Sequence, residues 1–312
     1  MQAEHYNGLI AVWKEQGYTS HDVVAKLRGI LHQKKIGHTG TLDPESKDVL
    51  AVGLGLGTKT FVLLPVLWKT YEAEVTFGVQ TVTEDIWGNV LKIHDVSKTP
   101  EEIIQAICSF GGTYDQIPPM YSAKKIDGKK LYQLAREGKI VERKAVPVTL
   151  KDIQVLSVKD NKARFIVTCS AGTYIRTLCV DIGKKLGCEA CMSSLTRVMA
   201  GGFSKEQALT LEKIKELADK NELESRLISI DTALGHFPKV IASNEFEKQL
   251  KNGNAISSNA VLGLQEASID VCSHDICVRL YLNNNGLDEF IGVYHLDKSS
   301  RLLKPVKIFY RN

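Results

Sequence analysis

The chain has 312 residues, 44% hydrophobic and 24% charged, which is the ordinary range for a globular protein with one large domain and a small one. Its net charge of +4 is compatible with nucleic-acid binding but does not by itself indicate it. The polar N-terminus argues against a signal peptide. Because Thr58-Lys59 interrupts the longest apolar stretch, no membrane-spanning helix is expected. Seven cysteines, an odd number, are typical of a reducing compartment, and we expect a cytoplasmic protein without a disulfide framework.

Two helices and a strand are predicted in the first third of the chain. Thr19 begins a capping signal that precedes apolar residues at helical spacing over residues 23–31. A second helix is expected over residues 100–110, after another capping threonine and before a glycine pair. Between them, residues 71–77 alternate apolar and polar side chains, as a half-buried strand does, and Tyr71 heads the apolar face.

The next pattern is a strand followed closely by a helix. Residues 163–169 read as a strand, and after the turn at residues 172–174 apolar residues recur at helical spacing over 175–186. Strands and helices that do not alternate regularly favour an α+β fold over a doubly wound parallel sheet.

The chain changes in character near Pro238. Beyond it lie short alternating runs separated by turn residues, namely 276–282, 290–296 and 302–309. We therefore expect one domain over residues 1–236 and a small β-rich domain over residues 237–312.

Two cysteine-containing stretches could in principle hold a metal. Cys188 and Cys191 have the spacing of half a zinc site, and a later stretch contributes Cys272, His274 and Cys277. Structural zinc needs two closely spaced pairs, which the later stretch lacks, and Cys188 falls at the end of a predicted helix. We expect no metal.

Two glycine-containing segments differ in whether they carry side chains that could take part in chemistry. Residues 53–57, Gly-x-Gly-x-Gly, lack the spacing of a dinucleotide fingerprint or a P-loop and are interpreted as a glycine-rich turn. Residues 35–44, Lys-Ile-Gly-His-Thr-Gly-Thr-Leu-Asp-Pro, combine two glycines with a histidine and an Asp-Pro corner, and Pro44 restricts the backbone that aims the Asp43 carboxylate. From the residues alone, this loop fits a functional carboxylate and a surface turn in which Asp43 caps a helix equally well.

The loop around Asp43 resembles a motif of the TruB family of tRNA pseudouridine-55 synthases, and three later stretches resemble further motifs of that family in the same order. These stretches are residues 71–88, 116–136 and 172–183. The tail, residues 296–309, is similar to the short PUA-like RNA-binding domain of bacterial members. The resemblance implies a pseudouridine synthase-like fold, with a mixed, largely antiparallel sheet flanked by helices, and a PUA-like C-terminal domain.

The resemblance also implies a reaction. Family members isomerise uridine 55 in the T-psi-C loop of tRNA to pseudouridine, by cleaving the C1′–N1 glycosidic bond of a flipped-out base and rejoining the base through C5. Asp43 matches the nucleophile, Arg176 the arginine that keeps it ionised, and Tyr71 the aromatic residue that stacks on the target base. Without the resemblance, Tyr71 would be assigned to the core. Asp85 either supports the arginine or caps a turn.

Further residues are implied at the substrate. His38, Tyr174 and Leu195 match residues that line the site around the flipped nucleotide, although His38 alone reads as a loop residue and Leu195 as core. Plausible contacts to the RNA backbone, among lysines that are usually only solvated, are Lys34, Lys35, Lys59, Lys124, Lys125, Arg136 and Arg143.

The isomerisation involves no redox change and transfers no group in or out, so the resemblance implies no cofactor and no metal. We expect the T arm of tRNA as partner, no membrane, no obligatory protein partner, and a monomer. One alternative is a non-catalytic tRNA-binding or folding protein, which would predict a damaged Asp43 or Arg176, yet both are intact. The other is a guide-RNA-dependent ribosomal RNA pseudouridine synthase subunit, whose N-terminal region is usually longer, whereas the likeness here begins near Gly8.

One position departs from the family pattern. The family commonly has glycine where this chain has Asp48. If that glycine serves a positive backbone angle, Asp48 bears a small strain and the local geometry is altered without loss of activity.

Overall fold

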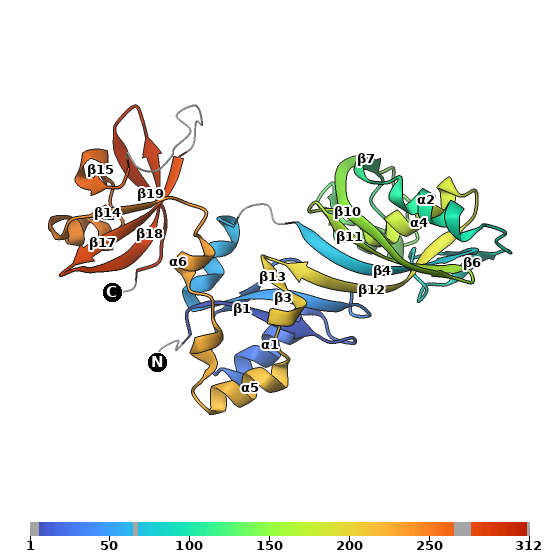
Figure 1. Ribbon diagram of the computed structural model, residues 1–312, viewed down its shortest axis with the longest axis horizontal. Helices are drawn as coiled ribbons and strands as arrows, with labels where there is room; N and C mark the ends of the chain where they lie inside the picture. The colour runs from blue at the N-terminus through green and yellow to red at the C-terminus, as the bar shows by residue number, and fades with distance from the viewer. Residues whose placement is uncertain (1–5, 65–67, 265–275, 311–312) are drawn as a thin grey trace.

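The computed structural model describes residues 6–64, 68–264 and 276–310 (Figure 1). Within these ranges, no helix has the length and apolar character needed to cross a membrane. The described chain is elongated and contains a large sheet and, towards its C-terminus, a separate smaller sheet.

The large sheet runs in the order β1-β3-β12-β4-β11-β10-β7, with β2 paired to β3 and β13 to β12. All of these neighbours are antiparallel except β3 and β12, which pair in parallel. The strands are β1 (Gly8–Lys14), β2 (Ile36–His38), β3 (Lys47–Leu54), β4 (Lys69–Phe77), β7 (Gly112–Gln116), β10 (Val146–Lys159), β11 (Lys162–Cys169), β12 (Ala190–Ala200) and β13 (Phe203–Ser204). The predicted mixed, largely antiparallel sheet of an α+β fold is confirmed.

The helices begin where their capping residues predict. Thr19 precedes α1 (Ser20–Ile30) and Thr99 precedes α2 (Pro100–Cys108), each in a reciprocal capping box, and α4 (Ile175–Lys185) follows β11 as expected. The other helices are α3 (Leu131–Arg136), α5 (Leu211–Asp219), α6 (Ile230–Ala233) and α7 (Glu247–Lys251), with short 3-10 helices η1 (Gly55–Val62), η2 (Lys205–Gln207), η3 (Leu223–Arg226), η4 (Asn244–Phe246) and η5 (Ser258–Ala260).

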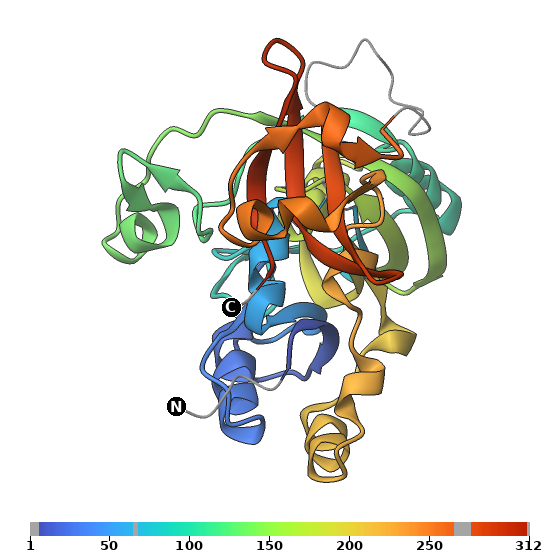
Figure 2. The same cartoon turned by 90° about the vertical axis from the view of Figure 1, so that its left-hand side faces the viewer.

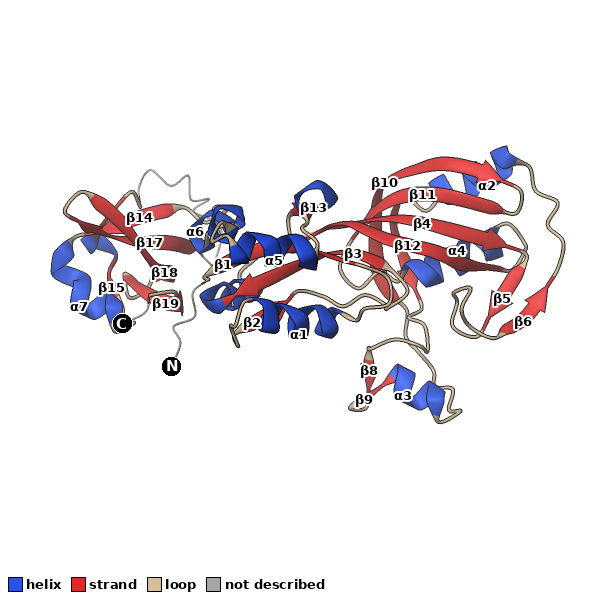
Figure 3. Cartoon of the chain, turned by 90° about the horizontal axis from the view of Figure 1, so that it is seen from below, coloured by secondary structure: helices blue, strands red, loops and turns tan. Residues whose placement is uncertain are grey.

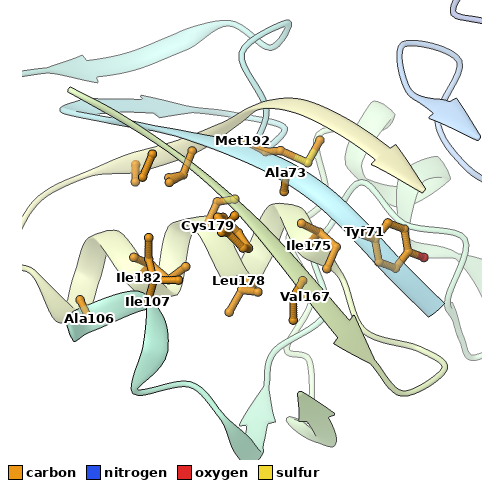
Figure 4. Close-up of a cluster of buried hydrophobic side chains, with 14 of the residues drawn as sticks. Tyr71, Ala73, Ala106, Ile107, Val167, Ile175, Leu178, Cys179, Ile182 and Met192 are labelled. Atoms are coloured by element: carbon orange, nitrogen blue, oxygen red, sulfur yellow. The ribbon is translucent and has the colours of Figure 1, made fainter. Parts of the chain in front are cut away.

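Three hydrophobic cores of described residues stabilise the large sheet, and the smallest lies on β1, β3 and β13 around Leu9, Val49 and Phe203. In the first, α2 and α4 pack on β4, β10, β11 and β12, with Phe165 and Ile182 fully buried. In the second, α1 and α5 pack on β1 and β3 through residues such as Leu27 and Ile214. Figure 4 shows Tyr71 at the end of the first core, where β4 carries its ring from the packed interior towards the site described below.

The smaller sheet runs in the order β15-β19-β18-β17-β14-β16. Its strands are β14 (Lys239–Ala242), β15 (Ile256–Ser257), β16 (Val261–Leu262), β17 (Ile276–Asn284), β18 (Leu287–Asp297) and β19 (Leu302–Ile308). A separate cluster, including Leu56, Leu234 and Phe309, packs this unit against η1 and α6. The expected β-rich C-terminal region is confirmed, while a domain boundary between residues 236 and 237 stays a prediction.

Two hairpins extend from the large sheet. One joins β5 (Val79–Thr81) to β6 (Val90–Ile93). The other joins β8 (Lys125–Ile126) to β9 (Lys129–Lys130) and continues into α3; together, residues 117–145 form an arm between β7 and β10 that stands away from the rest of the chain (Figures 2 and 3).

The glycine-rich turn predicted at residues 53–57 is wrong. Gly53 belongs to β3, and Gly55 begins the 3-10 helix η1. A Cβ on Gly57 would lie 2.1 Å from the carbonyl oxygen of Gly8, so glycine is needed there to let β1 pack against η1.

Candidate active site

A cavity of about 810 Å³ lies among segments that are far apart in the sequence. Its walls come from the loop 40–45, the first residues of β4, the turn at residues 83–87, the arm, and residues 172–176. Because no two of these segments are adjacent in the chain, the cavity depends on the tertiary fold.

Asp43 and Arg176 form an ion pair in this cavity. Arg176 Nη2 lies 3.3 Å from Asp43 Oδ2, and the two side chains are 11% and 49% exposed, respectively. The carboxylate is therefore open to a ligand, while the guanidinium is largely withdrawn from water. Arg176 Nη2 also donates to the carbonyl oxygen of Tyr121 at 2.9 Å, and Nη1 donates to that of Thr83 at 3.0 Å. The pair consequently has one close contact, not the parallel two that a guanidinium can make with a carboxylate.

Asp85 holds the other side of the guanidinium. Its Oδ2 lies 3.5 Å from Arg176 Nη1, and its Oδ1 accepts a hydrogen bond from Thr83 Oγ1 at 2.7 Å. The same residue starts a turn, since its carbonyl oxygen accepts from the amide of Gly88 at 3.2 Å. Both interpretations of Asp85 therefore describe this structure: it orients the arginine and it caps a turn.

Tyr71 combines the two roles that its sequence allowed. The residue is only 5% exposed and belongs to the first hydrophobic core, yet it lines the cavity. Burial raises the pKa of its hydroxyl to about 12, so the phenol stays protonated at neutral pH. Its ring can therefore present an apolar face to a ligand without carrying charge.

The other predicted substrate residues are only partly brought together. Tyr174 and Leu195 line the cavity, but His38 is not among its described lining residues. Instead, the His38 ring contacts His21 edge-on at 5.2 Å, and its Nδ1 lies 3.1 Å from the carbonyl oxygen of Gly40. Burial lowers the pKa of His38, which favours the neutral imidazole.

The predicted RNA-backbone contacts fall in different places. Arg136, on α3, lines the cavity, and Lys124 and Lys125 lie in the same arm. Arg143 Nη1 donates to the carbonyl oxygen of Pro118 at 3.1 Å, which ties the two ends of the arm together. The remaining three are Lys34 and Lys35, which precede β2, and Lys59, whose ammonium donates to the carbonyl oxygen of Ile308 at 3.0 Å and so links η1 to the smaller sheet.

A buried ion pair next to the cavity-lining residue Gly40 was not predicted. Arg197 Nε and Nη2 donate to the two oxygens of Asp48 at 2.6 and 2.8 Å, and both side chains are 0% exposed. Asp48 is not among the described residues with positive φ; it lies in β3, opposite Arg197 in the parallel pairing. The expected strain at Asp48 is therefore wrong, and the departure from glycine introduces a charge instead.

Lys14 was also missed. Its side chain is fully buried, and its ammonium donates to the carbonyl oxygens of Tyr18 at 2.8 Å and Ser46 at 2.5 Å. These bonds tie the end of β1 to the segment that follows Asp43. A sequence signal existed for Lys14 and Asp48, because each charge adjoins an apolar strand, but it does not reveal their partners.

The cysteines offer no sign of a metal cluster within the described ranges, where no group of three His, Cys, Asp or Glu side chains converges. Cys188 follows α4, and burial raises the pKa of Cys191 to about 11, which favours the thiol over the metal-binding thiolate. Cys272 and His274 lie outside the described residues.

Comparison with known proteins bears directly on the chain's family. Residues 28–175 match the TruB family pseudouridylate synthase N-terminal domain, and residues 176–235 match the tRNA pseudouridylate synthase B C-terminal domain. A protein of Alkaliphilus oremlandii named tRNA pseudouridine synthase B is 42% identical over 307 residues, 97% of this chain and 99% of that protein. The chain belongs to the TruB family. A Staphylococcus aureus protein of the same name is 45% identical over 315 residues, with the same shares covered.

Solved structures support the fold of this TruB family member. The chain is similar to one in a crystal structure of a Cbf5-Nop10-Gar1 complex, with a TM-score of 0.70, 24% identity, and coverage of 97% of this chain and 85% of the other. It is also similar to a chain of the archaeal box H/ACA sRNP Nop10-Cbf5 complex, with a TM-score of 0.69, 22% identity, and coverage of 99% and 88%. The fold and the family predicted from the motifs are both confirmed.

Proposed function

We propose that the protein isomerises uridine 55 in the T loop of tRNA to pseudouridine. Family membership and the relatives named tRNA pseudouridine synthase B support pseudouridylation of tRNA. The observation that carries the proposal is the half-exposed Asp43 carboxylate paired with the largely buried Arg176 guanidinium in a cavity walled by Tyr71.

The reaction conserves its atoms. The C1′–N1 bond of the nucleotide breaks, the uracil turns, and a C1′–C5 bond forms; C5 loses a proton and N1 gains one. No electron leaves or enters the substrate overall. The protein therefore has to hold the ribose and the loosened base in place and to supply a carboxylate at C1′ or its neighbours.

Asp43 starts the reaction in its ionised form. Whether its carboxylate attacks the sugar, attacks the base or removes a sugar proton, a neutral acid could not serve. The Arg176 guanidinium lies 3.3 Å from the carboxylate and supplies the opposite charge beside it. Contacts from Thr83, Asp85 and Tyr121 hold the guanidinium in place, so its position does not depend on the substrate.

The target base must leave its stack to reach Asp43. Extruding a base costs a few kcal/mol, which stacking on an aromatic residue can offset. Tyr71 is suited to this because its ring is packed against the first core on one side and lines the cavity on the other. Tyr174 and Leu195 complete the apolar wall around the base.

The test is conversion of an unmodified tRNA transcript by the purified chain, without guide RNA, nucleotide or added metal, followed by mapping of pseudouridine. We expect product at position 55 alone. Asp43→Asn should abolish product while changing tRNA affinity by less than two-fold, because the substitution preserves shape and removes only the charge. Asp115→Asn, the same change on the exposed part of β7 outside the cavity lining, is the matched control and should convert tRNA normally.

Three outcomes would overturn the proposal. Turnover by Asp43→Asn would remove the carboxylate from the mechanism. Tight tRNA binding without product from the unmodified chain would favour a tRNA-folding protein. Conversion only when a guide RNA and partner proteins are added would favour the ribosomal alternative.

A further inference from the structure

An exposed tryptophan stands at the cavity that contains Asp43. Trp87 is 46% exposed and contributes to the lining, whereas Tyr71, which lines the same cavity, is 5% exposed. Single exposed apolar residues are common, so exposure alone indicates no ligand contact. Trp87 is a candidate because its large, exposed aromatic side chain also lines the cavity. No step of the proposed reaction uses Trp87.

The turn that carries Trp87 is held to the site. Asp85, which begins this turn, contacts the guanidinium of Arg176. The amide of Ile86 donates to the carbonyl oxygen of Met192 in β12 at 2.8 Å, which ties the turn to the large sheet. Trp87 is thus mounted at a fixed place relative to the ion pair that contains Asp43.

Gly88 makes the same turn tight. A Cβ on this residue would lie 2.1 Å from Thr83 Oγ1 and 3.0 Å from the Thr83 amide nitrogen, so the two ends of the turn approach too closely for any side chain. The hydroxyl of Thr83 is the group that binds Asp85. The tight turn and the orientation of Arg176 therefore share one set of contacts.

Cationic and aromatic groups from the arm reach the same cavity. Tyr132 and Arg136 of α3 both line it, and the Arg136 guanidinium carbon lies 5.5 Å from the centre of the Tyr132 ring. Lys130 Nζ lies 5.5 Å from the same ring. A chain of phosphates and flat bases matches such a mixture of positive charge and ring faces.

We propose that Trp87 is a stacking subsite for a base of the RNA substrate adjacent to the flipped-out uridine. This inference rests on the proposed function. Extrusion of the uridine removes one neighbour from each flanking base and leaves a flat apolar face exposed. Unstacked RNA bases bind proteins by stacking on aromatic rings, and the exposed indole is available outside the place that Tyr71 gives to the target.

The subsite is a property of this chain and does not follow from its motif. The motif residues of this segment are Thr81, Thr83, Asp85 and Gly88, and Trp87 occupies a position between them that the motif leaves open. The motif residues build the rigid turn, and the residue at position 87 determines which side chain the turn presents to the substrate.

The experiment measures kcat/KM on a T-arm stem-loop RNA for the unmodified chain and for Trp87→Ala and Trp87→Phe. Loss of one stacking contact predicts that Trp87→Ala lowers kcat/KM by about five-fold to about one-hundred-fold, and that Trp87→Phe retains most of it. Leu91→Ala, on β6 of the same hairpin, is the matched control; Leu91 is 57% exposed, lies outside the cavity lining, and should leave kcat/KM within two-fold. Circular dichroism of each variant checks that the fold is intact.

A second arm identifies the contact as stacking. Stem-loops that carry an abasic residue immediately 5′ or immediately 3′ of the target uridine are assayed with both the unmodified chain and Trp87→Ala. At one of the two positions, base removal should lower kcat/KM for the unmodified chain and cause no further loss for Trp87→Ala. Equal losses with both proteins at both positions would overturn the inference.

Different results would overturn the inference and the proposed function. Absence of pseudouridine with the unmodified chain would overturn the proposed function. Normal turnover by the unmodified chain together with normal kcat/KM for Trp87→Ala would overturn only the stacking subsite.

Discussion

Removing the negative charge of Asp48 should destabilise the large sheet severely. Asp48→Asn keeps the size of the side chain, so the change leaves no cavity. It leaves Arg197, which is 0% exposed, without its counter-charge. Nη1 of this guanidinium has no hydrogen-bond acceptor among the described residues. The nearby Tyr71 hydroxyl is neutral, so it cannot replace the lost negative charge.

The magnitude follows from the two bonds of the pair, at 2.6 and 2.8 Å. The side-chain oxygen of the asparagine can retain one of the two hydrogen bonds. At the position of the second bond, however, its NH2 group would face an N–H donor of Arg197. Loss of one charged hydrogen bond and of the counter-charge in a buried pair costs about 3–5 kcal/mol. Burial raises the pKa of Asp48 despite the adjacent guanidinium, which indicates that dehydration offsets much of the attraction. The intact pair therefore adds little net stability although breaking it is expensive.

The assay is urea-induced unfolding combined with hydrogen exchange. The free energy of unfolding should fall for Asp48→Asn, and exchange should accelerate in β3 and β12 while β17 and β18 of the smaller sheet remain protected. Adding Arg197→Gln to Asp48→Asn should recover part of the loss, because the second change removes the unpaired charge. Glu216→Gln, which breaks two ion pairs of similar length, 2.7 and 2.8 Å, on the surface of α5, should leave unfolding almost unchanged.

Two results would refute this reasoning. A loss for Asp48→Asn no larger than that for Glu216→Gln would mean that the buried charge is compensated elsewhere. Additive losses in the double variant would mean that Asp48 and Arg197 do not act as a pair.

Three other predictions concern Arg176, His38 and Gly88. Arg176→Lys should lower kcat/KM by about ten- to one-hundred-fold in a tRNA assay, because a single ammonium cannot satisfy Asp43 and the groups that hold the guanidinium, and unchanged kinetics would contradict that role. The His38 imidazole, followed by NMR, should titrate below its ordinary pKa of 6.5; since its folded pKa is lowered, folding loses stability as pH falls from about 6.5 through the folded value, and a midpoint at or above 6.5 would contradict the burial argument. Gly88→Ala should lower the free energy of unfolding by about 1–3 kcal/mol and reduce turnover, because its methyl group would overlap Thr83; a variant of normal stability and activity would show that the turn can open at no cost.

The elements that could be predicted from the sequence are those with local signals. Thr19 and Thr99 predicted the starts of α1 and α2 because a helix cap is a short-range hydrogen-bond pattern. Residues 71–77 predicted β4 because one of its faces is more exposed than the other. β3 gave no such pattern, since seven of its eight residues are buried, and a continuous apolar run does not distinguish a strand from a helix.

The candidate site could be predicted only where a family motif indicated which residues, distant in the sequence, lie close together in the fold. Asp43 and Arg176 carry no local sign of being neighbours; their resemblance to family motifs predicted the pair that the structure shows. His38 was predicted by the same means, but the ring is turned to His21 instead of lining the cavity. The sequence suggests a backbone strain at Asp48 and not an ion pair, because spacing along the chain does not reveal Arg197, in another strand, as its partner.

The parallel pairing of β3 with β12 also has a consequence for synthesis on the ribosome. Asp48 and Arg197 are 149 positions apart, and a ribosome adding 5–20 residues per second takes about 7 to 30 seconds to translate that interval. During this time Asp48 lacks the guanidinium that binds both of its carboxylate oxygens in the folded chain, so β3 cannot be buried in its final form. The buried pair is therefore completed only after Arg197 has been added, and a chain released before β12 is made lacks both this pair and the cavity wall at Leu195. Abortive products of translation would carry the Asp43 loop without a site in which to use it.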